Sequence, residues 1–267
     1  MKLCLAALAA VFALGTAHAD DDALRAAIAG AQRTPANVVR DGARHPYQTL
    51  SFFGIKPTDT VVELIPGGGW YTEILAPYLR EHGTLIEAGN DPDGGPAAQR
   101  GAEHFKQKLD TAPAVYDRVK LGYFDAEAGK FELGKPGSAD LVLTFRNTHN
   151  WAPLGDEKTR AAFQAVYAVL KRGGTFGVVD HRLPAAMTQD AKASTGYLHE
   201  DYVIKLVESV GFKLVARSEI NANPKDHADH PEGVWALPPT YANKDVDHAV
   251  YEAIGESDRM TLKFVKP

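Results

Sequence analysis

Cysteine is almost missing from this chain: Cys4 is the single thiol among 267 residues. It lies in an N-terminal segment that starts with Lys2, continues as an apolar run over 3–14 and ends Ala17-His18-Ala19. A positive start, a short apolar core and an Ala-x-Ala end predict a secretory signal peptide that is cleaved after Ala19. The mature chain would then have no disulfide, no thiol nucleophile and no thiolate ligand for zinc. We therefore expect a periplasmic or secreted protein; a retained anchor or a buried helix is the alternative interpretation of this segment.

Long apolar runs and clusters of basic residues are also absent from the sequence. The N-terminal run of about twelve apolar residues is too short to cross a bilayer comfortably, so we expect no stable membrane insertion after cleavage. Without Lys2, 28 basic and 34 acidic side chains remain, and the formal net charge changes from −5 to −6. An acidic chain without a Lys/Arg cluster argues against nucleic-acid binding. The expected partner is a small molecule.

Strand patterns alternate with helical patterns over most of the chain, and the run over 139–145 is typical of a strand covered on both faces. Repeated strand–helix units predict a doubly wound, mainly parallel α/β sheet. We expect one domain over 20–267, with a helical cap at 20–58 and an irregular insertion at 219–258. The seven expected strands cover 60–65, 84–88, 119–123, 139–145, 175–180, 213–218 and 260–265. The expected helices cover 22–32, 35–53, 71–81, 96–109, 159–170 and 200–210.

The most informative segment is 61–72, Val-Val-Glu-Leu-Ile-Pro-Gly-Gly-Gly-Trp-Tyr-Thr. A glycine-rich turn between a buried strand and a helix lets the backbone approach a ligand and directs free N–H groups toward it. The carboxylate of Glu63 can accept several hydrogen bonds from a nucleoside-type cofactor. The glycine spacing is not the Gly-x-Gly-x-x-Gly of dinucleotide-binding proteins. The segment therefore predicts a cofactor site of another kind.

Several segments, in their order and spacing, resemble the class I S-adenosylmethionine-dependent methyltransferases, and more narrowly a group of bacterial methyltransferases with secretion signals. The matching segments are Val61-Val62-Glu63 with Gly67 and Gly69, 83–86, 123–126, 140–145 and 170–174, and for the narrower group 40–46, 66–73 and 258–264. The resemblance implies a Rossmann-like, seven-stranded sheet with an antiparallel last strand, and S-adenosyl-L-methionine as the cofactor. The cofactor-binding residues that it implies are Glu63, Pro66, Gly67, Gly69, Tyr71, Asn90, Asp91, Asp125, Ala126 and Arg146.

Two places depart from the family pattern. Ile65 stands where the family has its first glycine, so the turn is either differently shaped or narrower around the methionine part of the cofactor. After the second strand, either Asp91 or the amide of Asn90 is left to bind the ribose, because Glu87 lies inside the strand.

Asp125 matches the family pattern but has two interpretations. It either binds the adenine amine or caps the turn that follows it.

Polar side chains gather where the fourth and fifth strands end, at 146–151 and at Asp180-His181-Arg182. Ligands of open α/β sheets bind beyond the carboxyl ends of strands. His149 and His181 are therefore candidate catalytic bases, since an unperturbed imidazole titrates near neutrality; a hydrogen-bonded loop histidine is the alternative. The expected substrate-binding residues are Arg44, His45, Asn147, Asn150 and Trp151.

No metal site is expected. His149 and His181 can approach each other, with His45 or His199 as further ligands, but the sequence has no His-x-x-x-His pair and no two-carboxylate cluster. The stretch 226–230, Asp-His-Ala-Asp-His, lies in a loop rich in proline and asparagine and is interpreted as a solvated turn. Trp235, with the prolines that follow it, is expected to form an apolar lid over the substrate.

These features together predict S-adenosylmethionine-dependent methyl transfer to a small-molecule acceptor by an exported enzyme. The alternative is a non-catalytic ligand-binding or sensor protein on a methyltransferase fold, because export separates the protein from the cytoplasmic source of the methyl donor. The missing Gly-x-Ser-x-Gly elbow argues against a hydrolase.

Overall fold

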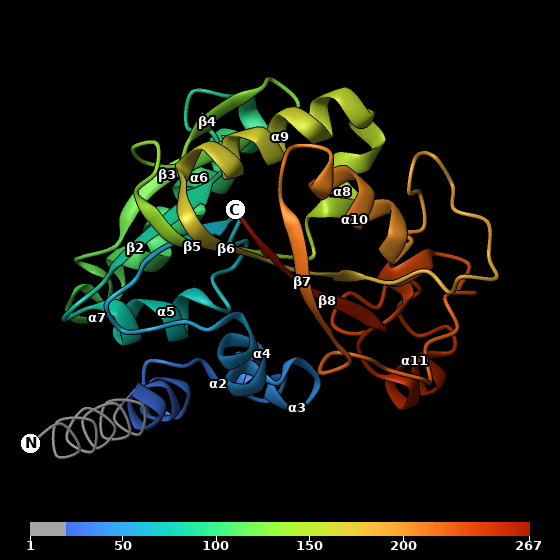
Figure 1. Ribbon diagram of the computed structural model, residues 1–267. Helices are drawn as coiled ribbons and strands as arrows, with labels where there is room; N and C mark the ends of the chain where they lie inside the picture. Colours follow the sequence, from blue (N-terminus) through green and yellow to red (C-terminus); the bar gives the residue numbers. More distant parts are fainter. Residues whose placement is uncertain (1–19) are drawn as a thin grey trace, which may run out of the picture.

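The computed structural model describes residues 20–267, so the expected signal peptide lies outside the described residues. The described chain forms a single mixed sheet of eight strands in the order β4-β3-β2-β1-β5-β6-β8-β7 (Figure 1). The strands are β1 (Thr60–Leu64), β2 (Thr84–Gly89), β3 (Lys120–Asp125), β4 (Lys130–Glu132), β5 (Ala139–Phe145), β6 (Leu170–His181), β7 (Lys213–Ser218) and β8 (Arg259–Val265).

Five neighbouring strands, β3, β2, β1, β5 and β6, run parallel. The last strand, β8, is antiparallel to both of its neighbours, β6 and β7. The predicted α/β class, the mainly parallel sheet and the antiparallel last strand are confirmed. The eighth strand, β4, was not predicted: it pairs antiparallel with β3 after a turn in which Gly129 has a φ of +68°. Three residues are too few for a period-two pattern to be visible in the sequence.

Helices cover both faces of the sheet. The α-helices are α2 (Pro35–Val38), α3 (Asp41–Arg44), α4 (Pro46–Phe53), α5 (Thr72–Leu79), α6 (Pro96–Asp110), α7 (Pro113–Tyr116), α8 (Thr148–Trp151), α9 (Asp156–Val169), α10 (Glu200–Glu208) and α11 (His248–Ile254), and residues 20–28 are also helical. Two 3₁₀ turns are η1 (Ala152–Leu154) and η2 (Gly233–Ala236). None of the helices within 20–267 is long and apolar enough to cross a membrane.

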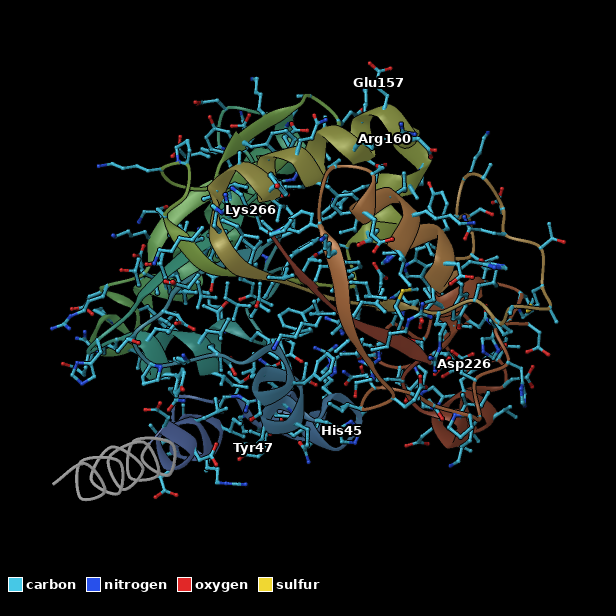
Figure 2. All side chains as sticks on the ribbon, viewed as in Figure 1. His45, Tyr47, Glu157, Arg160, Asp226 and Lys266 are labelled. Atoms are coloured by element: carbon cyan, nitrogen blue, oxygen red, sulfur yellow. The ribbon has the colours of Figure 1, made fainter. Side chains whose placement is uncertain are left out.

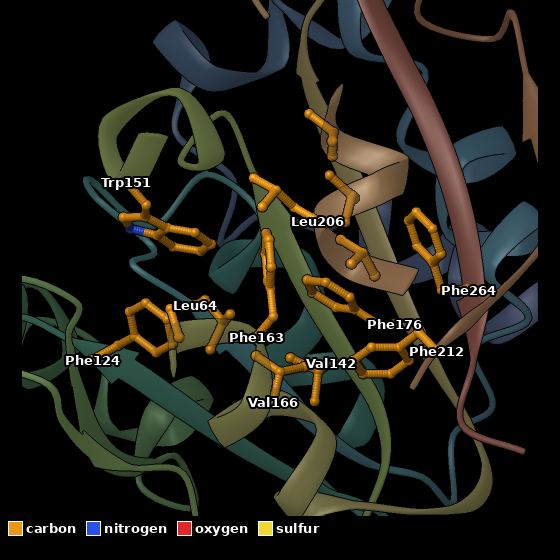
Figure 3. Close-up of a cluster of buried hydrophobic side chains, with 14 of the residues drawn as sticks. Leu64, Phe124, Val142, Trp151, Phe163, Val166, Phe176, Leu206, Phe212 and Phe264 are labelled. Atoms are coloured by element: carbon orange, nitrogen blue, oxygen red, sulfur yellow. The ribbon is translucent and has the colours of Figure 1, made fainter. Parts of the chain in front are cut away.

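Two hydrophobic cores lie on opposite faces of the sheet, because successive strand side chains point to opposite faces. In β1, Val61 belongs to the core that packs against α4, α5 and α6, whereas Val62 belongs to the core beneath α9 and α10. Figure 3 shows the second core, in which Phe163 of α9 and Phe176 of β6 have ring centroids 5.8 Å apart. With both faces covered, the edge where the parallel strands end is left to bind ligands.

The N-terminal cap is broken into short helices, where the sequence suggested one helix over 35–53. His45 ends α3 with a left-handed φ of +43°, and Pro46 then starts α4. The proline ring disfavours the right-handed helical conformation for the residue before it, which favours a break at His45. The helices α2 to α4 therefore turn back toward the C-terminal segment (Figure 1).

Candidate active site

The parallel strands bring several predicted site residues to one edge of the sheet, because their carboxyl ends coincide there. The glycine turn after β1 is central at this edge, with β2 and β3 on one side and β5 and β6 on the other. A cavity lies on each side. We call them the Asp125 cavity, beyond β2 and β3, and the histidine cavity, beyond β5 and β6.

The glycine turn has a left-handed backbone at three positions: Ile65 (φ +46°), Gly67 (φ +58°) and Gly69 (φ +75°). The N–H of Gly69 donates to the carbonyl oxygen of Pro66 at 2.9 Å. A side-chain carbon added at Gly67 or Gly68 would meet no atom within 4 Å, so the backbone there is bare and open. A ligand can therefore approach this turn closely.

Asn147 holds the glycine turn against β5. Its Nδ2 donates to the carbonyl oxygen of Leu64 at 2.9 Å and to the hydroxyl of Thr144 at 3.1 Å. Its side chain is buried and lines neither cavity. The structure thus places Asn147, expected to bind substrate, where it fixes the strained turn at Ile65.

Glu63 is buried beneath the same turn and lines neither cavity. Its Oε2 accepts a hydrogen bond from the hydroxyl of Thr72 at 3.2 Å, and Glu87 stands beside it in register on β2. Burial raises the pKa of Glu63 to about 7. Burial, and then repulsion from Glu63, raise the pKa of Glu87 well above its usual value. Burial and mutual repulsion therefore both favour the protonated form of this carboxyl pair.

The Asp125 cavity has a volume of about 450 Å³. Asp125 uses Oδ1 to accept the N–H of Ala128 at 2.8 Å, so it caps the turn as one sequence interpretation held. Its side chain also lines the cavity, beside the apolar surfaces of Phe124 and Trp151. The predicted residues that line this cavity are Asn90, Asp91, Asp125, Ala126, Asn150 and Trp151.

The histidine cavity has a volume of about 320 Å³. Asn150 lines it as well as the Asp125 cavity, so this side chain lies between the two. The predicted residues that line it are Arg44, Arg146, His149, Asn150 and His181, and those that complete it are Arg40, Val234, Trp235, Pro238, Pro239, Thr240, Glu256 and Ser257.

Asp180, at the end of β6, orients both histidines. Its Oδ1 lies 2.8 Å from Nδ1 of His149, and the backbone N–H groups of His149 and His181 donate to its two oxygens at 3.2 and 2.8 Å. With Nδ1 so engaged, Nε2 is the nitrogen of His149 that is left for a ligand. The rings of His149 and His181 are 4.9 Å apart.

His181 differs from His149 in its surroundings. Its Nδ1 lies 2.6 Å from the hydroxyl oxygen of Ser257, and the side chain is buried. Burial lowers the pKa of His181 well below its usual value, and the nearby His149 and Arg259 lower it further. His181 is therefore a neutral imidazole at physiological pH.

Among residues 20–267, His149, Asp180 and His181 form a group whose potential metal-ligating atoms lie within 4.8 Å of one another. The oxygens of Asp180 already accept three N–H groups, as described above. The contact between Asp180 and Nδ1 of His149 is also the arrangement of a general base with its orienting carboxylate, a geometry suited to proton transfer.

Other predicted residues lie away from both cavities. Tyr71 is buried and stacks on Phe145 with ring centroids 3.6 Å apart, and His45 forms the junction of α3 and α4. Arg146, expected at the cofactor, lies in the histidine cavity, whereas Trp151, expected at the substrate, lies in the Asp125 cavity.

Sequence reasoning missed Glu256 and Ser257, which complete the histidine cavity. A signal was present: both residues lie just before β8, the last strand. Because β8 runs antiparallel to β6, its first residues lie beside the last residues of β6, where His181 pairs with Arg259. An expected antiparallel final strand therefore places the segment before it at the ligand-binding edge.

No known family model and no curated protein matches the sequence. The fold matches solved structures. An S-adenosylmethionine-dependent methyltransferase from Aquifex aeolicus has a TM-score of 0.59 at 12% identity, over 88% of this chain and 95% of that one. The glycopeptide N-methyltransferase MtfA, solved with S-adenosyl-L-homocysteine, has a TM-score of 0.53 at 18% identity, over 88% and 99%.

The [4+2]-cyclase SpnF also matches, with a TM-score of 0.56 at 14% identity, over 84% of this chain and 81% of that one. At such identities the likeness concerns the fold. The chain has the class I S-adenosylmethionine-dependent methyltransferase fold, and a protein described as a cyclase shares that fold. The reaction must therefore be argued from the site itself.

Proposed function

We propose that this protein transfers a methyl group from S-adenosyl-L-methionine to a small-molecule acceptor. The observation that carries the proposal is the pair of cavities beyond the strands on either side of β1, with Asn150 lining both and the open backbone of Gly67 and Gly68 after β1. A cofactor seated across the turn would reach from the Asp125 cavity toward the histidine cavity. The acceptor would then lie beside His149.

The residues of the cofactor side fit a nucleoside. The open backbone of Gly67 and Gly68 permits close approach, and the side chain of Asp125 can accept a hydrogen bond from an exocyclic amine. Phe124 and Trp151 provide apolar walls for a flat ring. Asn90 or Asp91 would bind the ribose hydroxyls. Glu63 acts on the cofactor only through the turn that it supports, because its carboxyl group is buried.

When bound, S-adenosyl-L-methionine supplies a methyl group already activated on a positively charged sulfur, so alignment of the acceptor is the main requirement. Nε2 of His149 would accept the proton of an acceptor hydroxyl or protonated amine. Asp180 would hold the ring in place through Nδ1 and stabilise the imidazolium that forms. His181, held neutral, would add no competing positive charge beside it.

A non-catalytic binding or sensor protein is the second candidate, and the conformation of Ile65 favours it. A half-buried branched side chain stands where the resembling enzymes have glycine, at a position that retains the left-handed backbone. Such a side chain would narrow the site around the methionine part of the cofactor. Ligand binding without turnover would follow.

The test is titration calorimetry of residues 20–267 with S-adenosyl-L-homocysteine, followed by turnover assays over a panel of hydroxyl and amine acceptors. We expect binding, and His149→Gln should retain it while losing about a hundredfold or more of the transfer rate, the range for one general base. No binding by the wild type would refute the proposal. Binding without turnover over the panel would support the sensor.

We also propose export, on the strength of the N-terminal segment 1–19. Mass spectrometry of the protein recovered after expression of the full chain in bacteria tests it. A mature N-terminus at Asp20 in the periplasmic fraction is expected. An unprocessed N-terminus in the cytoplasm would contradict it.

A further inference from the structure

The histidine cavity contains an unusual excess of positive charge. Four arginines, Arg40, Arg44, Arg146 and Arg259, surround the single carboxylate of Glu256, and the first three line the cavity. The other nearby carboxylate, Asp180, is taken up by the histidines and their backbone. Even with Asp180 counted, two carboxylates cannot neutralise four guanidinium groups, so the cavity is electropositive.

Distances within this cluster show that Glu256 is shared. Its Oε1 lies 2.7 Å from Nε of Arg40, and its Oε2 lies 3.1 Å from Nε of Arg44. Nη1 of Arg259 lies 3.0 Å from Oε2, and Nη1 of Arg146 lies 3.9 Å from the same oxygen. Arg259 is further held by the carbonyl oxygen of Ala43. Arg40, Arg44 and Arg146 therefore each have N–H groups that are not used by Glu256; we call these the spare donors.

Two of these spare donors are buried. Nη1 of Arg44 and Nη2 of Arg40 have no hydrogen-bond partner and no exposed surface, and Arg44 as a whole is 2% exposed. A buried, unpaired donor on a charged group is destabilising. Burial lowers the pKa of Arg44 to about 10 against the attraction of Glu256. The side chain remains cationic at neutral pH, and Arg40 and Arg44 both line the cavity, so their charge favours an anion there.

The rest of the cavity is suited to the body of a small organic molecule. Trp235, Pro238 and Pro239 form an apolar wall, and the ring of Trp235 is 6.2 Å from that of His149. The volume of about 320 Å³ is at the small end of ligand pockets. A flat apolar ring carrying one anionic group matches both the wall and the arginines.

We propose that the methyl acceptor is a small anionic molecule whose carboxylate or phosphate group is bound by Arg40, Arg44 and Arg146. Its apolar body lies against Trp235 and presents the group to be methylated to His149. This inference rests on the proposed function, because the anionic molecule is a methyl acceptor only if the protein transfers methyl groups. The anion site itself can be tested without any turnover.

Three probes of similar shape separate charge from shape: benzoate, phenyl phosphate and the neutral benzamide. Their binding to residues 20–267 is measured by ligand-detected NMR at constant ionic strength. We expect benzoate, phenyl phosphate or both to bind about tenfold or more tighter than benzamide, as charge-assisted hydrogen bonds require. The probe that binds tighter identifies carboxylate or phosphate as the preferred group. Equal binding of all three would overturn the proposal.

The variants Arg40→Met and Arg146→Met should each weaken binding of the charged probes and leave benzamide unchanged. Arg160→Met is the matched control, since Arg160 pairs with Asp156 on the surface of α9. Calorimetry with S-adenosyl-L-homocysteine is run on the same samples. If the arginine variants lose this ligand instead of benzoate, the arginines serve the cofactor and the proposal is wrong. If the wild type binds benzoate but not S-adenosyl-L-homocysteine, the proposed function fails while the anion site stands.

Glu256→Gln gives an independent measurement that does not depend on removing an arginine. It deletes the internal counter-ion with little change of shape, so its melting temperature should be lower than that of the wild type. Added inorganic phosphate should raise the melting temperature of this variant more than that of the wild type, at matched chloride. An equal response of the two proteins would contradict the proposal.

Discussion

At the scale of single residues, the strained backbone of the site is its most informative feature. Ile65 and Arg146 are non-glycine residues with left-handed φ angles of +46° and +61°, and each directly follows a strand that ends at the ligand-binding edge. Strain of this kind persists only where surrounding contacts enforce it. Asn147 provides such contacts at Ile65. The sequence shows that Ile65 replaces a glycine of the family pattern, but it did not predict that Ile65 would have a left-handed backbone.

Replacing Ile65 tests this strain directly. Ile65→Ala and Ile65→Gly both lose the contacts of the side chain beyond Cβ, but only the glycine relieves the left-handed backbone. We expect Ile65→Gly to be more stable than Ile65→Ala by about 0.5–1 kcal/mol in urea unfolding. At the exposed Val250 of α11, the order should reverse, with alanine favoured by up to about 1 kcal/mol. Alanine more stable at both positions would show that Ile65 is not strained.

At the scale of elements, the strands were the most predictable part of the fold. The expected bounds of β5 and β7 agree with the structure residue for residue, because continuous or alternating apolar patterns mark strands strongly. Placing His149 and His181 at one edge followed from the parallel order alone. The Glu63–Glu87 pair could not be predicted in this way. The register between β1 and β2 places the two residues side by side, and neither strand's sequence determines that register.

This pair makes stability depend on pH. Both folded pKa values are raised, so the folded state binds more protons than the unfolded state above about pH 4.5. The free energy of unfolding therefore falls as pH rises from there toward and beyond 7. Glu87→Gln removes the part of this loss that Glu87 contributes, because the amide does not ionise. We expect the variant to gain about 1–2 kcal/mol over the wild type at pH 8 and little at pH 5.

Thermal unfolding at pH 5, 6, 7 and 8 measures the effect. Glu103→Gln is the matched control, because Glu103 is exposed on α6 and its substitution should leave the pH profile unchanged. A Glu87→Gln variant that is less stable than the wild type at every pH would show that the carboxyl pair is ionised and paired in some other way.

At the scale of the whole molecule, the two ends of the chain close the histidine cavity together. Arg40 and Glu256 are 216 positions apart and yet in contact. Figure 2 labels Asp226 in the C-terminal part of the chain. The sequence suggested a solvated turn over 226–230, which holds for the exposed His227 and Asp229 but is wrong for Asp226. Asp226 is buried and accepts hydrogen bonds from the hydroxyl of Tyr197 and the N–H of Asp258. Contacts over such separations leave no local pattern, so the sequence predicted the edge of the site but not its closure.

Glu256 should therefore control the stability of both ends at once. Glu256→Ala leaves the buried guanidinium groups of Arg44 and Arg259 without their carboxylate, a change worth about 3–5 kcal/mol for a buried ion pair. Hydrogen exchange should lose protection in α3 and α4 and also in α11, while the central strands β1 and β5 change only by the global loss of stability. A gain of exchange confined to α11 would mean that the ends of the chain are not coupled.

The matched control for this substitution is Asp229→Ala in the same C-terminal segment. The side chain of Asp229 is 70% exposed and its nearest partner is His230 at 3.8 Å. We expect a change within about 0.5 kcal/mol, as for other exposed side chains. Because the arginines that Glu256 holds are those proposed to bind the acceptor, added benzoate or phosphate should restore part of the lost protection in α3 and α11 together. If protection returned in only one of α3 and α11, anion binding would not couple the two segments that close the cavity.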